Sequence, residues 1–321
     1  MNDAFFDAIQ RLQSTYMMFP AFQKAFERME GNLQVYRKTG VAQHLLVLGE
    51  SGTGKTTLAR LFAERYPKQV TPERDLIPVL CVSVPAAATI GGIVEAVLAQ
   101  LGDYEPERGT VSSKTARATR LVHACGVEML LIDEAQHVQD RGKTQSQYFV
   151  GDWLKTFMDA VGLPVTLLGL PRTQSLLQVN EQLRRRFAHR LSLSIGQTDG
   201  IFGNGVSLEL FSSLNNALSL SLNPKPYEWS ELGARFHFAT HGRIAYVKQL
   251  LIAGYGRAIS VNSDEISTEE LAYAFTSSIW AAGVGALNPF DPSFEFRALD
   301  RAGEPFQQGE IGTPPSQRRR N

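Results

Sequence analysis

One segment constrains the fold of this chain more than any other, and it spans residues 49–56. It reads GESGTGKT, which has the GxxxxGKT spacing of a phosphate-binding loop, the Walker A motif. An apolar run of strand length, residues 44–48, precedes the loop, and apolar side chains at helical spacing follow it from Thr57 onward. Because such a loop works between a buried strand and a helix N-terminus, this order predicts an α/β nucleotide-binding fold.

The residue types of the loop each have a physical role in holding a polyphosphate. Glycines let the backbone curl so that successive N–H groups face the phosphates, and the following helix adds the positive end of its dipole. Lys55 is expected to reach the β- and γ-phosphates, and the hydroxyl of Thr56 to bind Mg²⁺. We therefore predict that ATP and Mg²⁺ bind here, with contacts from Gly49, Glu50, Ser51, Gly52, Thr53, Gly54, Lys55, Thr56 and Thr57.

An acidic pair at the end of a second apolar strand completes the predicted site. Residues 129–132 are apolar, and Asp133 and Glu134 follow them directly, roughly eighty residues after the phosphate-binding loop, as in a Walker B motif. Asp133 is expected to support the Mg²⁺ ion, and Glu134 to polarise the water that attacks the γ-phosphate. Asp133 is thus a predicted metal and cofactor residue, and Glu134 a predicted catalytic residue.

Further apolar runs predict the remaining strands of one sheet. Residues 77–84, 163–169 and 190–194 have strand-like patterns and alternate with helix-like segments. Together with the first two runs, they predict a parallel five-stranded sheet flanked by helices. In this class of ATPase a polar side chain often ends the fourth strand and senses the γ-phosphate. Here the tip is Gly169-Leu170-Pro171, which has no polar side chain, so Arg172 and Thr173 are the candidates for the residue that senses the γ-phosphate.

Arginines near the end of the predicted core are candidates for contacts to the γ-phosphate. Arg184, Arg185 and Arg186 lie at a helix end just before the fifth strand, where an arginine can reach the nucleotide of a neighbouring subunit. Arg186 is the first choice and Arg185 the second; the alternative is an exposed basic helix terminus, favoured by the helix dipole. Arg243 follows Gly242 at the first turn of a later helix, where a helical lid would bring it over the phosphates.

The net charge gives no general indication of nucleic-acid binding. Lys and Arg together number 32, as do Asp and Glu, so contact with DNA would need a local basic patch. The best candidate is the polar region that starts at Gly102, which we predict to face DNA through Arg108, Lys114, Arg117 and Arg120. An exposed loop with ordinary surface cations is the alternative.

The sequence predicts four segments along the chain. Residues 1–30 form two short amphipathic helices, 31–199 the ATPase core, 200–281 a helical lid, and 282–321 a tail rich in Gly, Pro, Gln and Arg. Glycines in residues 202–205 indicate a flexible joint between core and lid. The tail has too little apolar periodicity to fold alone, so it either docks on a partner or is disordered.

Other features limit what the chain can be. Cys81 and Cys125 have no partner at metal-ligand spacing, and we expect reduced, packed thiols. His237 and His241 are four residues apart but lack a third ligand at matching spacing, so a metal site is not expected. No run of about eighteen apolar residues and no signal-like N-terminus occurs, which leads us to expect a cytoplasmic protein without membrane contact.

The order of these features resembles that of AAA+ ATPases: a phosphate-binding loop, an Asp-Glu strand, an arginine-rich helix end and Gly-Arg at a lid helix. Closer details are similar to the transposition regulators TnsC and TniB. They are Met18-Phe19-Pro20 and the residues 49–56, 125–135 and 182–187. The resemblance covers about residues 15–255, and it implies an AAA+ core with a C-terminal helical lid.

The resemblance implies an ATPase that assembles on double-stranded DNA as a hexameric or heptameric ring or a helical filament. It would link a target-selection factor, which can be RNA-guided, to transposase subunits, and ATP hydrolysis would take the assembly apart. Lys114 and Arg117 would line the DNA channel, Arg186 would act in the next subunit, and the tail would contact the transposase or its endonuclease partner. The chain differs from the common family pattern at Gly169-Leu170-Pro171, where a polar residue is expected. This difference is expected to affect the rate of ATP hydrolysis more than nucleotide binding.

Three other functions stay open from the residues themselves. A helicase loader or replication initiator would need a helicase-binding element or a separate duplex-reading domain. An export or signalling ATPase would not touch DNA. An adaptor that holds ATP as a structural ligand would barely turn it over.

Overall fold

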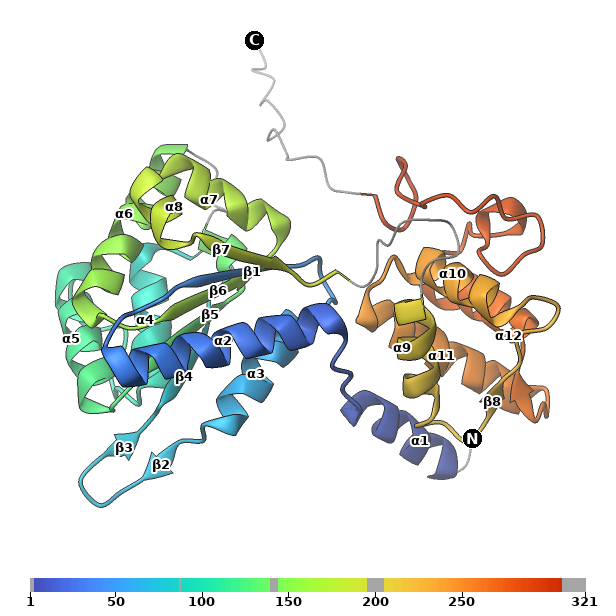
Figure 1. Cartoon of the computed structure of the whole chain (residues 1–321), viewed down its shortest axis with the longest axis horizontal. Helices are drawn as coiled ribbons and strands as arrows, with labels where there is room; N and C mark the ends of the chain where they lie inside the picture. The colour runs from blue at the N-terminus through green and yellow to red at the C-terminus, as the bar shows by residue number, and fades with distance from the viewer. Residues whose placement is uncertain (1–2, 87, 139–143, 195–204, 308–321) are drawn as a thin grey trace, which may run out of the picture. The chain divides into compact units, whose positions relative to one another are not determined.

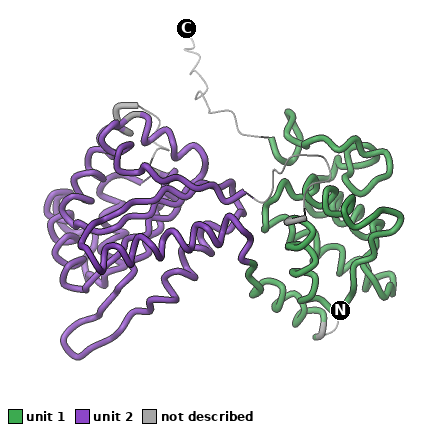
Figure 2. Tube along the Cα trace, viewed as in Figure 1, with its two compact units in different colours: residues 1–17, 195–321 green, residues 18–194 purple. Residues whose placement is uncertain are grey.

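The computed structural model describes residues 3–86, 88–138, 144–194 and 205–307. Contacts divide the chain into two compact units, which Figure 2 shows in different colours. Residues 18–194 form the core unit, and residues 1–17 with 195–321 form the C-terminal unit. This division differs from the expected boundary at residue 30, because only the first seventeen residues group with the C-terminal part of the chain.

The core unit is built on a five-stranded parallel sheet with the order β4-β5-β6-β1-β7. Its strands are β1 (Leu45–Leu48), β4 (Val79–Ser83), β5 (Met129–Asp133), β6 (Val165–Gly169) and β7 (His189–Ser192). β1 lies between β6 and β7, with Leu46 in register with Leu167 on one side and with Arg190 on the other. The predicted parallel five-stranded sheet is thus confirmed, and the carboxyl ends of β1, β5 and β6 meet at one edge.

Helices cover both faces of this sheet (Figure 1). The helices on one face are α2 (Pro20–Thr39) and α3 (Lys55–Arg65). Those on the other face are α4 (Ile90–Gln100), α5 (Val111–Ala124) and α6 (Thr144–Val161). Short elements connect the later strands: η1 (Ala135–Val138), η2 (Pro171–Thr173), α7 (Gln174–Val179) and α8 (Glu181–Arg186). A small antiparallel hairpin lies outside the main sheet, made of β2 (Gln69–Val70) and β3 (Asp75–Leu76).

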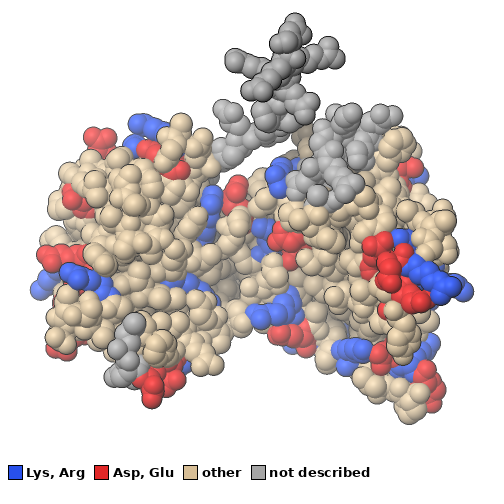
Figure 3. Space-filling model, turned by 180° about the vertical axis from the view of Figure 1, so that it is seen from behind, with Lys and Arg blue, Asp and Glu red and all other residues tan. Residues whose placement is uncertain are grey.

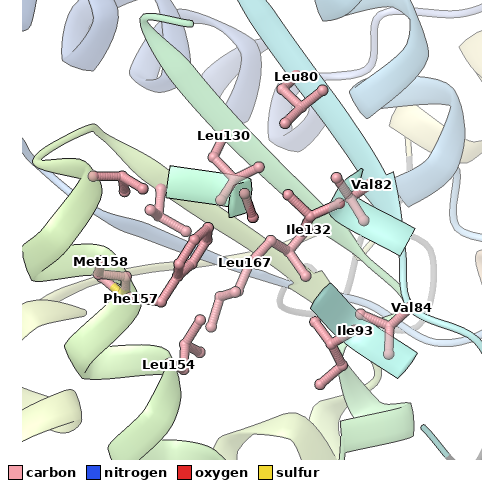
Figure 4. Packing of buried hydrophobic residues seen from close by; sticks show 14 of the residues in the cluster. Leu80, Val82, Val84, Ile93, Leu130, Ile132, Leu154, Phe157, Met158 and Leu167 are labelled. Carbon is pink, nitrogen blue, oxygen red and sulfur yellow. The ribbon is translucent and has the colours of Figure 1, made fainter. Parts of the chain in front are cut away.

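Apolar side chains fill the space between the sheet and the second set of helices. Val82, Ile132 and Leu167 come from neighbouring strands and belong to one packed cluster with Ile93 of α4 and Phe157 of α6 (Figure 4). All five are at most 4% exposed. Burying side chains of this size stabilises the fold by about 1.5–3 kcal/mol each, which fixes the strand ends that carry the site.

The region after Gly102 differs from the expected polar loop, because residues 111–124 form the helix α5. The helix begins after Thr110, whose hydroxyl accepts a hydrogen bond from the N–H of Ser113. Ala118 and Val122 are buried in the core cluster, at the i, i+4 spacing of one helix face. The pattern is hard to see in the sequence because polar and small residues surround these few apolar ones.

The C-terminal unit is mainly helical. Its elements are α1 (Asp3–Ser14), α9 (Gly205–Asn215), β8 (Ser221–Leu222), α10 (Trp229–Thr240), α11 (Ile244–Ser260), β9 (Glu265–Ile266), α12 (Thr268–Ala274), the π-helical turn η3 (Phe275–Ile279) and η4 (Gly285–Leu287). The N-terminal helix α1 packs on α11, since Phe5 stacks on Tyr255 with 5.6 Å between ring centroids. The ammonium of Lys248 also donates to the carbonyl of Gln13 at 2.8 Å. These contacts place α1 in this unit.

The segment 288–306 packs on the helices of the C-terminal unit. Arg235 of α10 is 2% exposed and donates to the carbonyl oxygens of Pro289 at 2.6 Å and Asp291 at 2.8 Å. Four apolar side chains of the segment are at most 4% exposed: Phe290, Phe294, Leu299 and Phe306. The expected tail is therefore folded as far as residue 306. Phe290 and Phe294 contact aromatic side chains of α10, and Phe306 contacts Tyr246 of α11. Periodicity within the tail does not reveal these long-range contacts.

The remaining expectations concern the flexible joint, the end of the tail, membrane spans, metal sites and the two cysteines. The joint at 202–204 and the arginines at 318–320 lie outside the described residues. Within the described residues, no helix is long and apolar enough to cross a membrane, and no cluster of three metal-ligating side chains occurs. Cys81 and Cys125 are free thiols.

Candidate nucleotide-binding site

The phosphate-binding loop starts where β1 ends. The N–H of Gly49 donates to the carbonyl of Gly169 at the tip of β6, at 3.1 Å. A Cβ atom at Gly49 would lie 2.4 Å from Oγ1 of Thr53, so a side chain does not fit at this turn. Gly52 and Gly54 have φ angles of 80° and 95°, in the left-handed region that favours glycine. Backbone geometry therefore requires the glycines that the spacing singled out.

Lys55 begins α3 and is buried, with 6% exposure. Its ammonium donates to the carbonyl oxygens of Gly49 at 2.7 Å and Glu50 at 2.9 Å. These contacts hold a positive charge against the loop and next to the N-terminus of α3, whose dipole adds to it. An anion such as a polyphosphate is the ligand that this arrangement favours.

Two oxygen-bearing side chains meet between the loop and the tip of β5. The hydroxyl of Thr56 donates to Oδ2 of Asp133 at 2.6 Å, and Asp133 is 2% exposed. Burial raises the pKa of Asp133 above its usual range, while hydrogen bonds from Thr56 and from the N–H of Glu134 act in the opposite direction. A hydroxyl and a carboxylate are the oxygen donors that Mg²⁺ prefers, and a cation here would offset the cost of burying the carboxylate. The two residues fit the predicted ion.

Glu134 follows β5 with a φ of 56°, an uncommon conformation for a residue with a side chain. The turn lets its N–H donate to Oδ1 of Asp133 at 2.8 Å. Its carboxylate accepts a hydrogen bond from Nε2 of Gln136, and Nε2 of His137 lies 3.6 Å from the same carboxylate. The side chain of Glu134 is 36% exposed, so water can reach it.

The tip of β6 has no polar side chain of its own. Of the two predicted candidates, Thr173 is fully buried and Arg172 is exposed. The hydroxyl of Thr173 lies against Gly169, and a second polar group at the tip comes from Gln136, whose Oε1 accepts a hydrogen bond from the N–H of Leu170 at 3.1 Å. Sequence reasoning does not single out Gln136, and the available signal is only a polar residue shortly after the Asp-Glu pair.

A family model described as "Bacterial TniB protein" matches residues 9–193 of this chain. The chain belongs to this family. The match includes every residue of the site described so far, from the phosphate-binding loop to the tip of β6. A comparison with curated proteins finds no match.

The TniB-family chain is similar in fold to several solved structures. Cdc6p from Pyrobaculum aerophilum is similar with a TM-score of 0.60 and 12% identity, over 83% of this chain and 69% of that chain. The Aeropyrum pernix ORC1 protein in complex with DNA has a TM-score of 0.58 and 14% identity, over 83% and 68%. The Aeropyrum pernix ORC2 protein in its ADP form has a TM-score of 0.56 and 15% identity, over 81% and 69%. At these identities the likeness concerns the fold alone, which is the AAA+ P-loop fold.

The arginines predicted to contact the γ-phosphate belong to both units of this TniB-family chain. Arg186, at the end of α8, makes a two-contact ion pair with Asp159 of α6, with Nη2 3.0 Å from Oδ2. Arg185 is largely exposed and pairs with Glu181 at 2.6 Å. Arg243 lies at the N-terminus of α11 in the C-terminal unit. The core unit by itself therefore positions Arg185 and Arg186 but not Arg243.

The four cations expected to contact DNA have different surroundings. Lys114 is 6% exposed, and its ammonium lies 2.5 Å from a carboxylate oxygen of Glu95. Arg117 pairs with Asp103 at 2.6 Å, and its side chain is 25% exposed. The other two cations are exposed, Arg108 and Arg120. The expectation that Lys114 faces DNA does not fit its burial, because its ammonium is paired with Glu95 inside the core unit.

Figure 3 shows how the charges are distributed on one face of the molecule. Lys and Arg side chains lie among Asp and Glu side chains there, without a continuous basic stripe. This mixed surface agrees with the equal numbers of basic and acidic residues in the sequence. A DNA contact on such a surface must come from a few local cations.

Proposed function

We propose that this TniB-family protein binds ATP with Mg²⁺ and hydrolyses it to ADP and phosphate. The observation that carries the proposal is the contact of Thr56 with Asp133 at 2.6 Å, directly beside the phosphate-binding loop and one residue before Glu134. Bound Mg²⁺, held by Thr56 and Asp133, would neutralise charge on the β- and γ-phosphate oxygens. The loop amides and Lys55 would hold the phosphates in place.

Glu134 is the residue that we propose to act on water. Its carboxylate orients a water molecule and accepts a proton from it as the water oxygen bonds to the γ-phosphorus. The bond from the γ-phosphorus to the bridging oxygen breaks, and that oxygen leaves with ADP. Lys55 stabilises the negative charge that moves onto the phosphate oxygens during this step.

Replacing Glu134 with Gln tests this proposal. The amide keeps the shape of the carboxylate but does not accept a proton, so we expect turnover to fall by about 10²–10⁴-fold. ATP affinity should stay close to that of the wild type. Phosphate release and equilibrium binding of a fluorescent ATP analogue measure the two properties. Glu64→Gln, on the exposed face of α3, is the matched control, and wild-type turnover in Glu134→Gln would refute the assignment.

We further propose that the protein acts in the cytoplasm on double-stranded DNA, as a regulator of transposition. Two findings support this: membership of the TniB family, and a fold similar to that of an ORC1 protein whose structure contains DNA. The ATP-bound protein would assemble on a duplex as a ring or filament and link a target-selection factor to transposase subunits. Hydrolysis would then take the assembly apart.

Arg108 and Arg120 are the cations of the core unit that we propose to contact the phosphate backbone of DNA. Both are exposed, and Arg108 is paired with the exposed Glu105, at 2.7 Å. Exposed pairs of this kind contribute little, so a phosphate can replace the carboxylate at small cost. Lys114 and Arg117 would instead support α5 and the preceding loop through their ion pairs.

Arg186 is proposed to act on the nucleotide of a neighbouring subunit, with Arg185 as the second choice. The two-contact ion pair with Asp159 fixes the direction of its guanidinium group. Mixing Arg186→Ala subunits with Glu134→Gln subunits would create some interfaces that contain both intact residues, and hydrolysis should partly return there. No recovery would argue that Arg186 acts within its own subunit or has a structural role. Arg243 is proposed to contact the phosphates from the C-terminal unit.

A second candidate function is an adaptor that holds ATP with little turnover. The glycine at the tip of β6, where related ATPases often have a polar side chain, is the observation that favours it. The comparison with Glu134→Gln separates the two functions. Wild-type turnover as slow as that of the variant would favour the adaptor, and a large difference would exclude it.

A further inference from the structure

Gln136 joins two strand tips of the site. It lies in η1, two residues after Glu134, and is 2% exposed. Its Nε2 donates to the carboxylate of Glu134, and its Oε1 accepts from the N–H of Leu170 at 3.1 Å. The amide thus uses both of its ends, one on the residue after β5 and one on the residue after β6. A buried amide satisfied in this way is held in one orientation.

The glycine at the tip of β6 leaves space for this amide. A Cβ atom at Gly169 would lie 3.1 Å from Oε1 of Gln136 and 2.2 Å from Oγ1 of Thr173. The second distance is far shorter than atoms allow, and Thr173 is fully buried, so it cannot easily move. Any side chain at position 169 would therefore disturb the packing of Gln136 and Thr173. This explains in physical terms why the tip carries no polar side chain of its own.

We propose that Gln136 is a positioning residue for Glu134, and that it supplies the polar group that the tip of β6 lacks. The inference rests on the proposed ATPase activity and deepens it. A glutamate side chain that is 36% exposed has several rotamers available. The link through Gln136 to the backbone of Leu170 selects one rotamer of Glu134 and fixes its carboxylate relative to β6. β6 is the neighbour of β1, the strand that leads into the phosphate-binding loop.

Gln136→Met removes both hydrogen bonds and keeps a side chain of similar length. We expect kcat for ATP hydrolysis to fall by about 10–100-fold, the effect of losing the hydrogen bond that orients a charged group. Nucleotide affinity should remain near that of the wild type, because the loop, Lys55 and Asp133 are untouched. Gln100→Met, at the exposed end of α4, is the matched control for the substitution itself.

Gln136→Glu provides a readout that a purely structural role would not move. It keeps the size of the side chain and places a second carboxylate beside that of Glu134. The groups already facing Glu134 are Asp133 and His137. Two carboxylates in contact resist being ionised together, so the rise of kcat with pH should move to higher pH. The wild type and Gln100→Met should keep the same profile.

The outcomes separate this inference from the proposed function. If the wild type hydrolyses ATP and both Gln136 variants keep its kcat and pH profile, the inference is wrong and the ATPase proposal stands. A parallel loss of kcat and nucleotide affinity would also contradict it, because it would indicate general disruption of the site. If the wild type does not hydrolyse ATP, both proposals fail. Should Gln136→Met not fold, the pH profile of Gln136→Glu decides.

Discussion

Lys114 and Arg120 lie on the same helix, yet their surroundings give them different roles. Lys114 is 6% exposed and pairs with Glu95 of α4 at 2.5 Å, whereas Arg120 is exposed. Breaking the charge-assisted hydrogen bond of a buried ammonium costs about 1.5–3 kcal/mol. This cost opposes any movement of Lys114 toward a DNA phosphate. The two cations look alike in the sequence because the partner that distinguishes them is nineteen residues away.

A paired set of variants tests this difference between the residues. Combining Arg108→Ala with Arg120→Ala should weaken duplex binding equally for all sequences and reduce the salt slope by up to about two, roughly 0.9 per lost phosphate contact. Lys114→Met should lower the melting temperature and leave the salt slope unchanged. Fluorescence anisotropy of a labelled duplex at several salt concentrations measures the slope. The same slope in the double variant and the wild type would place the DNA contact on another surface.

The positions of single residues could be predicted from the sequence where they depend on the local backbone. Lys55 and Thr56 lie where the motif spacing places them, because the turn and the helix start fix both. Asp133 could be predicted because it ends an apolar strand. Gln136 could not, because its contact with Leu170 joins residues 34 positions apart and depends on the order of the strands.

At the scale of elements, a half-buried histidine, His44, joins the start of β1 to the start of β6. Nδ1 of His44, just before β1, accepts a hydrogen bond from the N–H of Val165 at 3.1 Å, which requires a ring without a proton on that nitrogen. Burial lowers the pKa of His44 to about 4, and the positive charge of Arg186 acts in the same direction. The histidine therefore makes the stability of the sheet depend on pH.

The direction of this dependence follows from the two pKa values of His44. The native pKa of about 4 lies below the ordinary value of 6.5, so the unfolded chain takes up the proton first as the pH falls. The stabilisation is complete above about pH 6.5 and is lost as the pH falls toward 4, amounting to about 2–3 kcal/mol. His44→Asn keeps an acceptor for Val165 and does not titrate in this range. We expect it to reduce the loss of core stability between pH 7 and pH 4.

Urea unfolding at several pH values measures this effect. Trp229→Phe and Trp280→Phe in the background leave Trp153 of α6 as the tryptophan that reports on the core unit. His237→Asn is the matched control, because burial also lowers the pKa of His237 to about 4 but this residue lies in the C-terminal unit. An equal dependence on pH in His44→Asn and its parent would contradict the account.

Elements were predictable where one stretch of sequence carries their pattern. Four strands of the parallel sheet, β1, β4, β5 and β6, are mainly apolar runs, so their existence and parallel arrangement could be predicted. Helix α5 has few apolar residues, and its burial depends on α4 and α6. The segment 288–306 has no helical or strand periodicity in its sequence. Arg235 and aromatic residues of α10 and α11 hold it in place instead. Both were therefore missed.

At the scale of the whole molecule, the proposed function is one cycle of assembly and disassembly driven by ATP. The core unit holds the phosphate-binding loop and also Arg186, which is paired with Asp159 within the chain. A neighbour's γ-phosphate carries more negative charge than a single carboxylate and would compete with Asp159 for this arginine. Assembly of subunits should therefore depend on bound ATP, and duplex DNA would align the subunits.

Sedimentation velocity of the full chain tests this account most directly. It would be run with duplex DNA, with a non-hydrolysable ATP analogue, with both and with neither. We predict large assemblies only when both are present, and none with Lys55→Ala, which loses the charge that holds the phosphates. Assembly with nucleotide alone that DNA does not change would contradict the account and favour an export or signalling ATPase.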